Sequence, residues 1–251
     1  LFPGGKKMKK IVTLATLLLV GSMVFAQQQT VQKKSNTETE TSVENEYLND
    51  VDGEIIMTLA NSDELDNKLV ALQFLENAIK DGNTSDAVIQ ALDQLAGEGI
   101  TSESRTNGRL KNNFPQIRRQ ACLLMAQVPT EHSKNTLVKI AIADNEPMVI
   151  AAAVQSLGVI GINENDEVVS AIAFANKRNQ VLNPTSSLAM EVLNAYEALS
   201  SSCDNIKIIT ESIAMIATDY HYVTPVRTKA SKLLKSLTNS SSSSSNNGNL
   251  K

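Results

Sequence analysis

The chain has 251 residues, a formal net charge of −4 at neutral pH, no tryptophan and only 4% aromatic residues. An acidic chain without clustered lysines and arginines is a poor candidate for binding nucleic acid or an anionic membrane surface. Two cysteines and two histidines leave little material for a metal site or for nucleophilic catalysis.

The first 26 residues have the parts of a secretory signal peptide in the usual order. Met8 is followed by two lysines, an apolar run from Ile11 to Val20, and the small-residue site Val24-Phe25-Ala26. The apolar run is too short to span a membrane comfortably, so cleavage after Ala26 is favoured over an uncleaved anchor. We expect residues 1–26 to be a signal peptide, with residues 1–7 upstream of the true start at Met8.

Cleavage after Ala26 would remove four lysines and no acid, which changes the net charge from −4 to −8. The signal peptide predicts export to the periplasm, with the extracellular medium as the alternative. It also predicts no membrane insertion once it has been cleaved.

Polar segments flank the part of the chain that can form a core. Residues 27–46 contain almost nothing to bury and predict a disordered spacer. Residues 238–251 include six consecutive serines, Ser240–Ser245, and predict a disordered, flexible tail. Residues 47–237 are rich in Ala, Leu, Ile and Val, and their length suits one domain with a continuous core.

One pattern occurs five times in this domain: an apolar residue, alanine four residues later, and leucine or methionine four residues after that. Steps of four place all three side chains on one helix face, and the central alanine indicates close approach of a second helix. The first position is polar in two of the five. The five triplets are Asn67/Ala71/Leu75, Ile117/Ala121/Met125, Val149/Ala153/Leu157, Thr185/Ala189/Leu193 and Val226/Ala230/Leu234.

Between these segments lie other helical runs, so the predicted order is helix A, turn, helix B, repeated five times. Prolines stand one or two residues ahead of the last four triplets, where a helix can begin. The A helices are expected at about 50–60, 84–96, 131–143, 167–177 and 205–218, and the B helices at about 64–80, 115–128, 147–161, 184–200 and 225–237. Gly97–Asn113 is expected to be an exposed loop.

The segment from Asp144 to Gly161 resembles a HEAT-type repeat, in which Asp and Pro precede a second helix with Val-Arg, then Ala, then Leu-Gly. Ile117-Arg118 and Val226-Arg227 match the Val-Arg part. This resemblance covers residues 47–237, the proposed HEAT-like repeat domain. It implies an all-α fold, a right-handed α-solenoid (α-α superhelix) of about five helix pairs.

The family's arginine is replaced by Lys68, Ile150 and Ser186 in the other three segments. We therefore expect interrupted charge contacts between repeats and stacking by apolar side chains.

No arrangement of residues predicts catalysis, a cofactor or a metal. There is no HxxxH or CxxC spacing, no G-x-S-x-G elbow and no glycine-rich phosphate loop. Cys122 and Cys203 lie two predicted repeats apart, which is beyond disulfide reach. Gly158 and Gly161 stand where a helix is expected to end.

The resemblance implies that the B helices line the binding surface. The Tyr220-His221-Tyr222 turn is a second candidate, because tyrosines often anchor partners; its alternative role is to cover the end of the last repeat. The partner-binding candidates are Arg118, Arg119, Gln155, Glu191, Asn194, Tyr220, His221, Tyr222, Arg227 and Lys229.

Three functions remain open at this point. The first is an exported scaffold or adaptor, without catalytic activity, that binds a protein or peptide. The second is an accessory subunit of an enzyme or of a cofactor-modifying system. The third is a structural protein of the cell envelope.

Overall fold

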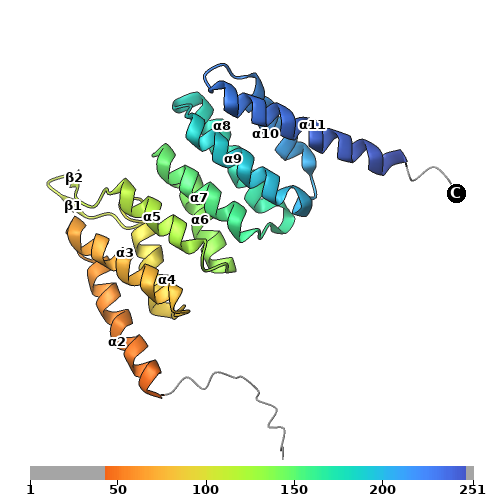
Figure 1. Ribbon diagram of the computed structural model, residues 1–251. Helices are drawn as coiled ribbons and strands as arrows, with labels where there is room; N and C mark the ends of the chain where they lie inside the picture. The colour runs from red at the N-terminus through yellow and green to blue at the C-terminus, as the bar shows by residue number, and fades with distance from the viewer. Residues whose placement is uncertain (1–42, 247–251) are drawn as a thin grey trace, which may run out of the picture. The chain divides into compact units, whose positions relative to one another are not determined.

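The computed structural model describes residues 43–246, with side chains described for residues 51–239 (Figure 1). The expected signal peptide, residues 27–42 of the expected spacer and residues 247–251 lie outside the described residues.

Within the described residues the fold is all-α, as predicted, apart from one short hairpin. The α-helices are α2 (Val43–Ala60), α3 (Leu65–Lys80), α4 (Asp86–Ala96), α5 (Pro115–Met125), α6 (Glu131–Ala143), α7 (Pro147–Ile160), α8 (Glu167–Leu182), α9 (Ser186–Leu199), α10 (Ile206–Thr218) and α11 (Thr224–Asn246). Short 3-10 turns occur at Glu164–Asp166 and Ser200–Ser202. The hairpin consists of β1 (Arg105–Thr106) and β2 (Arg109–Leu110).

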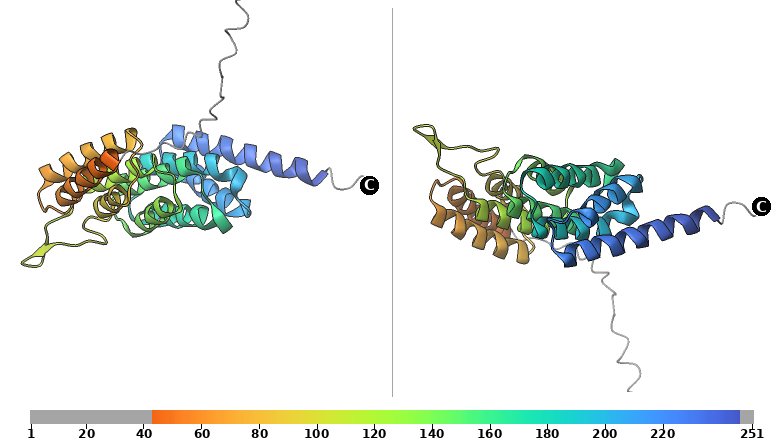
Figure 2. Two further views of the ribbon diagram at one scale, coloured as in Figure 1. Left: turned by 90° about the horizontal axis from the view of Figure 1, so that it is seen from below. Right: turned by 90° about the horizontal axis from the view of Figure 1, so that it is seen from above.

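The helices form two layers of consecutive pairs (Figures 1 and 2). In one layer α2, α4, α6, α8 and α10 contact one another in that order, and in the other α3, α5, α7, α9 and α11 do the same. Each even-numbered helix also contacts the odd-numbered helix that follows it in the chain. The pairs α2–α3, α4–α5, α6–α7, α8–α9 and α10–α11 therefore stack side by side, and their contacts are with neighbouring pairs.

Small residues set the spacing between neighbouring odd-numbered helices. All five central alanines of the sequence pattern are buried in the core. Gly158 of α7 lies against α9 so closely that a Cβ built on it would be 2.9 Å from the Cα of Ala195. Gly161 has a left-handed φ of 72° and ends α7, as the sequence predicts, whereas Gly158 serves a helix contact instead of a cap.

In α3, α5 and α9 the residue three before the central alanine contacts the next helix pair, and we call this register the linking position in all five odd-numbered helices. In α3 it is Lys68, whose Nζ lies 2.5 Å from Oε2 of Glu98, in the connection after α4. In α5 it is Arg118, whose guanidinium binds the carboxylate of Asp144, in the connection after α6. Both ion pairs are buried, so charged side chains join consecutive pairs inside the stack.

The linking position is uncharged in the next two odd-numbered helices. Ile150 of α7 is buried among apolar side chains. Ser186 of α9 accepts a hydrogen bond, 3.1 Å long, from the backbone N–H of Val223 in the connection after α10. The same register therefore joins consecutive pairs by an ion pair in α3 and α5 and by a single hydrogen bond in α9.

Three helix boundaries differ from the sequence-based expectation by five residues or more. Helix α2 begins at Val43, inside the expected spacer. Helix α8 continues to Leu182, because Arg178 binds backbone carbonyls of Ile142 and Asp144 and Gln180 donates to Asp219 (2.9 Å). Helix α11 continues to Asn246, beyond its expected end at residue 237, and residues 238–246 contain no proline or glycine to end it.

The Gly97–Asn113 connection is an ordered loop with an exposed hairpin at its far end. Asn107 and Gly108 have left-handed φ angles of 52° and 78°, which suits a tight hairpin turn. At the root, the buried side chain of Asn112 accepts from the N–H of Ser104 (2.9 Å) and donates to the carbonyl of Ser102 (2.6 Å). These hydrogen bonds close the base of the loop, and the Ser102 hydroxyl, 3.1 Å from the Gln94 Oε1, joins the loop to α4.

Candidate partner-binding surface

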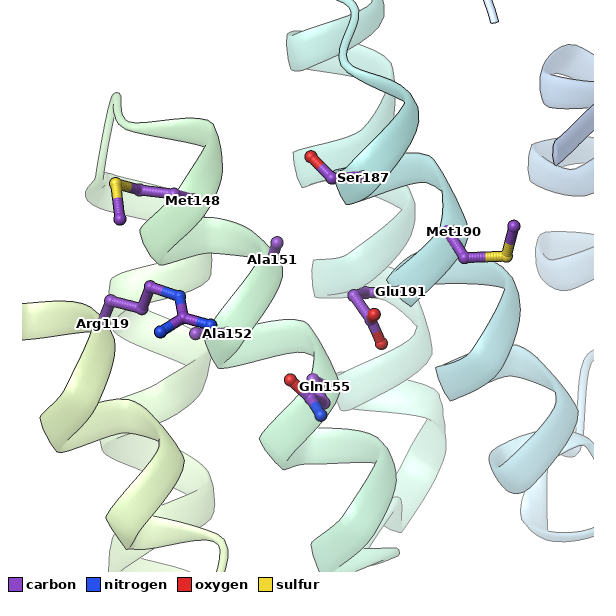
Figure 3. A pocket seen from close by; sticks show the side chains of 8 residues that line it. All are labelled: Arg119, Met148, Ala151, Ala152, Gln155, Ser187, Met190 and Glu191. Atoms are coloured by element: carbon purple, nitrogen blue, oxygen red, sulfur yellow. The ribbon is translucent and has the colours of Figure 1, made fainter. Parts of the chain in front are cut away.

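The outward surface of α5, α7 and α9, here called the odd-helix face, contains a hollow of about 280 Å³. It brings together side chains from three helices, and the two outermost in sequence, Arg119 of α5 and Glu191 of α9, are 72 residues apart in the chain. Its lining consists of Arg119, Met148, Ala151, Ala152, Gln155, Ser187, Met190 and Glu191 (Figure 3).

The floor of the hollow is formed by small side chains on α7. Ala152 lies beside Arg119 of α5 and Ala151 lies on the side of α9, so the α7 side chains between the flanking helices are small (Figure 3). Met148 and Met190 add flexible, polarisable apolar surface, which adapts to differently shaped partners. The hollow therefore offers an apolar floor with adaptable edges.

Opposite charges stand on the two sides of this floor. Arg119 comes from α5 and Glu191 from α9, and Gln155 lies between them on α7 (Figure 3). Arg119 is exposed and makes no hydrogen bond or ion pair with the described residues. The arrangement can bind a carboxylate on one side, a cation on the other and a peptide group at the Gln155 amide.

A row of polar contacts extends from the hollow toward α11. The Asn194 amide donates to Glu191 (3.0 Å), and Lys229 donates to the Asn194 Oδ1 (2.6 Å). Lys229 also forms an ion pair with Glu197 at 2.9 Å. Two further predicted candidates, Asn194 and Lys229, thus lie at one edge of the same surface and hold its polar groups in place.

The prediction that Arg118 and Tyr222 contact a partner is wrong, because both side chains are buried. Arg118 is only 1% exposed and is fully engaged: besides Asp144 it donates to the Glu98 carbonyl (3.2 Å) and to Asn113 (2.8 Å). Tyr222 is 3% exposed, and burial raises the pKa of its phenol to about 12. Both side chains stabilise the stack and are not available to a partner.

The other two residues of the Tyr-His-Tyr turn remain on the surface. Tyr220 packs its ring against the ring of His221, with centroids 4.2 Å apart. Asp219 binds the His221 ring at 2.7 Å. A hydrogen bond from the backbone N–H of His221 is the main reason why the pKa of Asp219 lies below its ordinary value. The turn connects α10 to α11, and its residues do not line the hollow.

Arg227 also lies apart from the odd-helix hollow. It lines a separate hollow of about 470 Å³ on α10 and α11, together with Ser231, Lys232 and Lys235. Its Nε is buried and has no hydrogen-bond partner among the described residues.

Sequence reasoning missed the two methionines, Ser187 and the alanine floor. The repeated pattern held a signal that could have found most of the lining. Residues two before and two after a central alanine point to the hollow: Arg119, Ala151 and Ser187 stand two before, and Gln155 and Glu191 two after. The residues two before and two after each central alanine would therefore have been a better set of candidates for the partner-binding surface than residue type alone.

Neither cysteine is suited to act as a nucleophile. Cys122 is buried, which raises the pKa of its thiol to about 12, and burial together with Asp166 raises the pKa of Cys203 to about 11. No group of three or more His, Cys, Asp or Glu side chains that could hold a metal occurs in residues 51–239. Among the described helices, none combines the length and apolar character needed to cross a membrane.

Comparison with known proteins assigns the chain to no family. No protein-family model, no curated protein and no solved structure matches it.

Proposed function

We propose that this protein is an exported scaffold or adaptor that binds a protein or peptide on its odd-helix face and has no catalytic activity of its own. In this proposal the stacked pairs form a HEAT-type, right-handed α-solenoid. Two layers of helices with contacts between consecutive pairs support it, as does the linking position that joins those pairs. Export rests on the signal-peptide pattern of residues 8–26.

One observation carries the binding proposal. Arg119, Gln155 and Glu191 come from three different helices, and the stack brings them to one hollow whose floor is small and apolar. An extended peptide suits this shape, because its backbone can lie over the alanines of α7 while charged side chains reach Arg119 and Glu191. Methionine edges extend the range of apolar side chains that fit.

The test is selection of peptides from a random displayed library against the full chain, followed by binding measurements with variants. Arg119→Glu and Glu191→Lys should each weaken the selected peptides about tenfold or more, because they invert a charge at the contact. Lys139→Glu is the matched control: Lys139 is exposed on α6, in the other layer. Peptides that bind both hollow variants as tightly as the unchanged chain would refute the site.

A further inference from the structure

The last linking position of the stack has no following helix pair among the described residues. It is Arg227 of α11, three residues before the central Ala230. In α3 and α5 the same position is occupied by Lys68 and Arg118, and each binds a carboxylate in the connection of the next pair. Arg227 carries the same kind of charge at the same register, yet its buried Nε has no acceptor.

The surface around Arg227 is cationic and lightly packed. Lys232 and Lys235 line the same hollow and form no ion pair with the described residues, and Thr228 and Ser231 add hydroxyl groups. Of the side chains from residues 206–239, five are Lys or Arg and two are Asp or Glu. The end of the stack formed by α10 and α11 is therefore basic on a protein whose net charge is negative.

The opposite end of the stack has the reverse character. Val70 and Phe74 of α3 are 39% and 45% exposed. Val70 stands one residue before the central alanine of α3, Ala71, and Phe74 stands three residues after it. In α9 the residues at those two places, Leu188 and Val192, are 2% and 0% exposed. Val70 and Phe74 thus occupy positions that a preceding helix pair buries elsewhere in this same stack.

Acidic residues surround this apolar end. Residues 51–80 include six Asp or Glu side chains against two lysines, and one of those lysines, Lys68, is buried. The connection between α2 and α3 carries two exposed acids: Asp63, which pairs with Lys111 (3.3 Å), and Glu64, whose carboxylate forms no ion pair with the described residues. Connections of this kind are where Arg118 finds Asp144 within the stack.

We propose that copies of this chain associate head to tail, with the α2–α3 end of one copy stacked on the α10–α11 end of the next. In this contact Arg227 binds a carboxylate of the α2–α3 connection, and the second copy covers Val70 and Phe74. Two α2–α3 ends facing each other would instead bring like charges together, which disfavours a symmetric dimer through that end. A head-to-tail contact does not close on itself, so chains of copies form as concentration rises.

Sedimentation velocity of the full chain over a concentration series tests this proposal. Phe74→Glu alters only the α2–α3 end, and Arg227→Glu only the α10–α11 end; both side chains are at least partly exposed, so each variant should fold. The unchanged chain should sediment faster as concentration increases, and high salt should weaken that increase because it screens the charges. Each variant alone should be a monomer at every concentration.

A mixture of the two variants gives the sharpest result. Phe74→Glu keeps an intact α10–α11 end and Arg227→Glu keeps an intact α2–α3 end, so an equimolar mixture should form a one-to-one dimer that does not grow further. Matched controls are Val159→Glu on α7 and Lys139→Glu on α6, which change exposed residues of the middle pair and should associate like the unchanged chain. A chain that stays monomeric without substitution overturns the proposal, and so does association that only one of the two end variants abolishes.

Discussion

Arg118 and Asp144 form a two-point ion pair inside the stack, with Nε–Oδ2 and Nη2–Oδ1 distances of 2.7 and 3.2 Å. Neither side chain is exposed, and the pair joins α5 to the connection that leads into α7. Asp144 also accepts a hydrogen bond from the N–H of Glu146 (2.9 Å), so it fixes the start of α7 as well. The Asp144 carboxylate, which directly follows α6, thus binds a side chain of α5 and the backbone just before α7.

Removing one partner of this pair should destabilise the fold strongly. We expect Arg118→Met to lower the free energy of unfolding by about 3–5 kcal/mol, because it leaves the Asp144 carboxylate buried without its counter-charge. Urea denaturation measures the loss. Arg119→Met is the matched control, since the adjacent arginine is exposed and unpaired, and its effect should stay within about 0.5 kcal/mol. Equal effects of the two substitutions would contradict the role given to Arg118.

Gly158→Ala should destabilise the protein, although alanine is the better helix former. In a solvent-exposed helix the change would stabilise by about 0.5–1 kcal/mol. At position 158 the new Cβ would lie 2.9 Å from the backbone of Ala195, so α7 and α9 must move apart. We expect a net loss of about 1–3 kcal/mol, as in other overpacked cores. Thermal unfolding will check this, and a higher melting temperature would show that the helices are not in close contact there.

Ala153→Glu should destabilise the stack by at least about 3 kcal/mol, because a carboxylate would be buried in the core without a partner. Gln155→Glu introduces the same side chain on the same helix, two residues away on the exposed odd-helix face, and should be nearly neutral. Urea midpoints of the two variants give the comparison. A midpoint for Ala153→Glu near that of the unchanged chain would refute the packing of α7.

The Asp166 carboxylate should make the free energy of unfolding depend on pH in acidic solution. Burial acts to raise its pKa, but hydrogen bonds from the backbone N–H groups of Asn205 (2.7 Å) and Asp204 (2.9 Å) favour the charged form, and the pKa lies below its ordinary value of 3.8. The stabilisation is therefore complete above pH about 3.8 and is lost as pH falls through the lower folded-state pKa.

The variant that tests this is Asp166→Asn, since asparagine tolerates the left-handed backbone of that residue (φ 59°) and cannot ionise. The unchanged chain should be more stable than the variant at pH 5, and the difference in urea midpoint should shrink between pH 4 and pH 2. A difference that is constant over this range would mean that the Asp166 charge does not stabilise the contact between the α7–α8 connection and the α9–α10 connection.

Much of the fold could be predicted because the apolar pattern is local. Helices of one pair lie next to each other in the chain, so spacing at steps of four gave both the helices and the faces they bury. The central alanines are in the core as expected. The ends of the helices were harder to predict. Helix α8 continues to Leu182 because Arg178 and Gln180 donate hydrogen bonds to acceptors in neighbouring pairs. Contacts between pairs cannot be recognised from the local sequence.

The candidate surface was less predictable, because a charged residue gives no sign of its direction. Arg118 and Arg119 are adjacent and chemically identical, yet one is buried against Asp144 and the other is exposed at the hollow. Their places relative to Ala121 separate them, three residues before it and two before it. Register within the repeated pattern was therefore the informative quantity, and residue type alone was not.

The hairpin at Asn107–Gly108 has a practical consequence for anyone who cuts or labels this protein. Its base is closed by the Asn112 hydrogen bonds and by the bond from the Lys111 N–H to the Ser104 carbonyl (2.8 Å), while a Cβ built on Gly108 at its tip would meet no atom within 4 Å. A protease nick at the tip would divide the polypeptide between α4 and α5, two helices that pack against each other, and an inserted tag would only lengthen the loop between them. We expect the two fragments to stay associated after such a cut, because the contact between α4 and α5 does not depend on the tip of the hairpin.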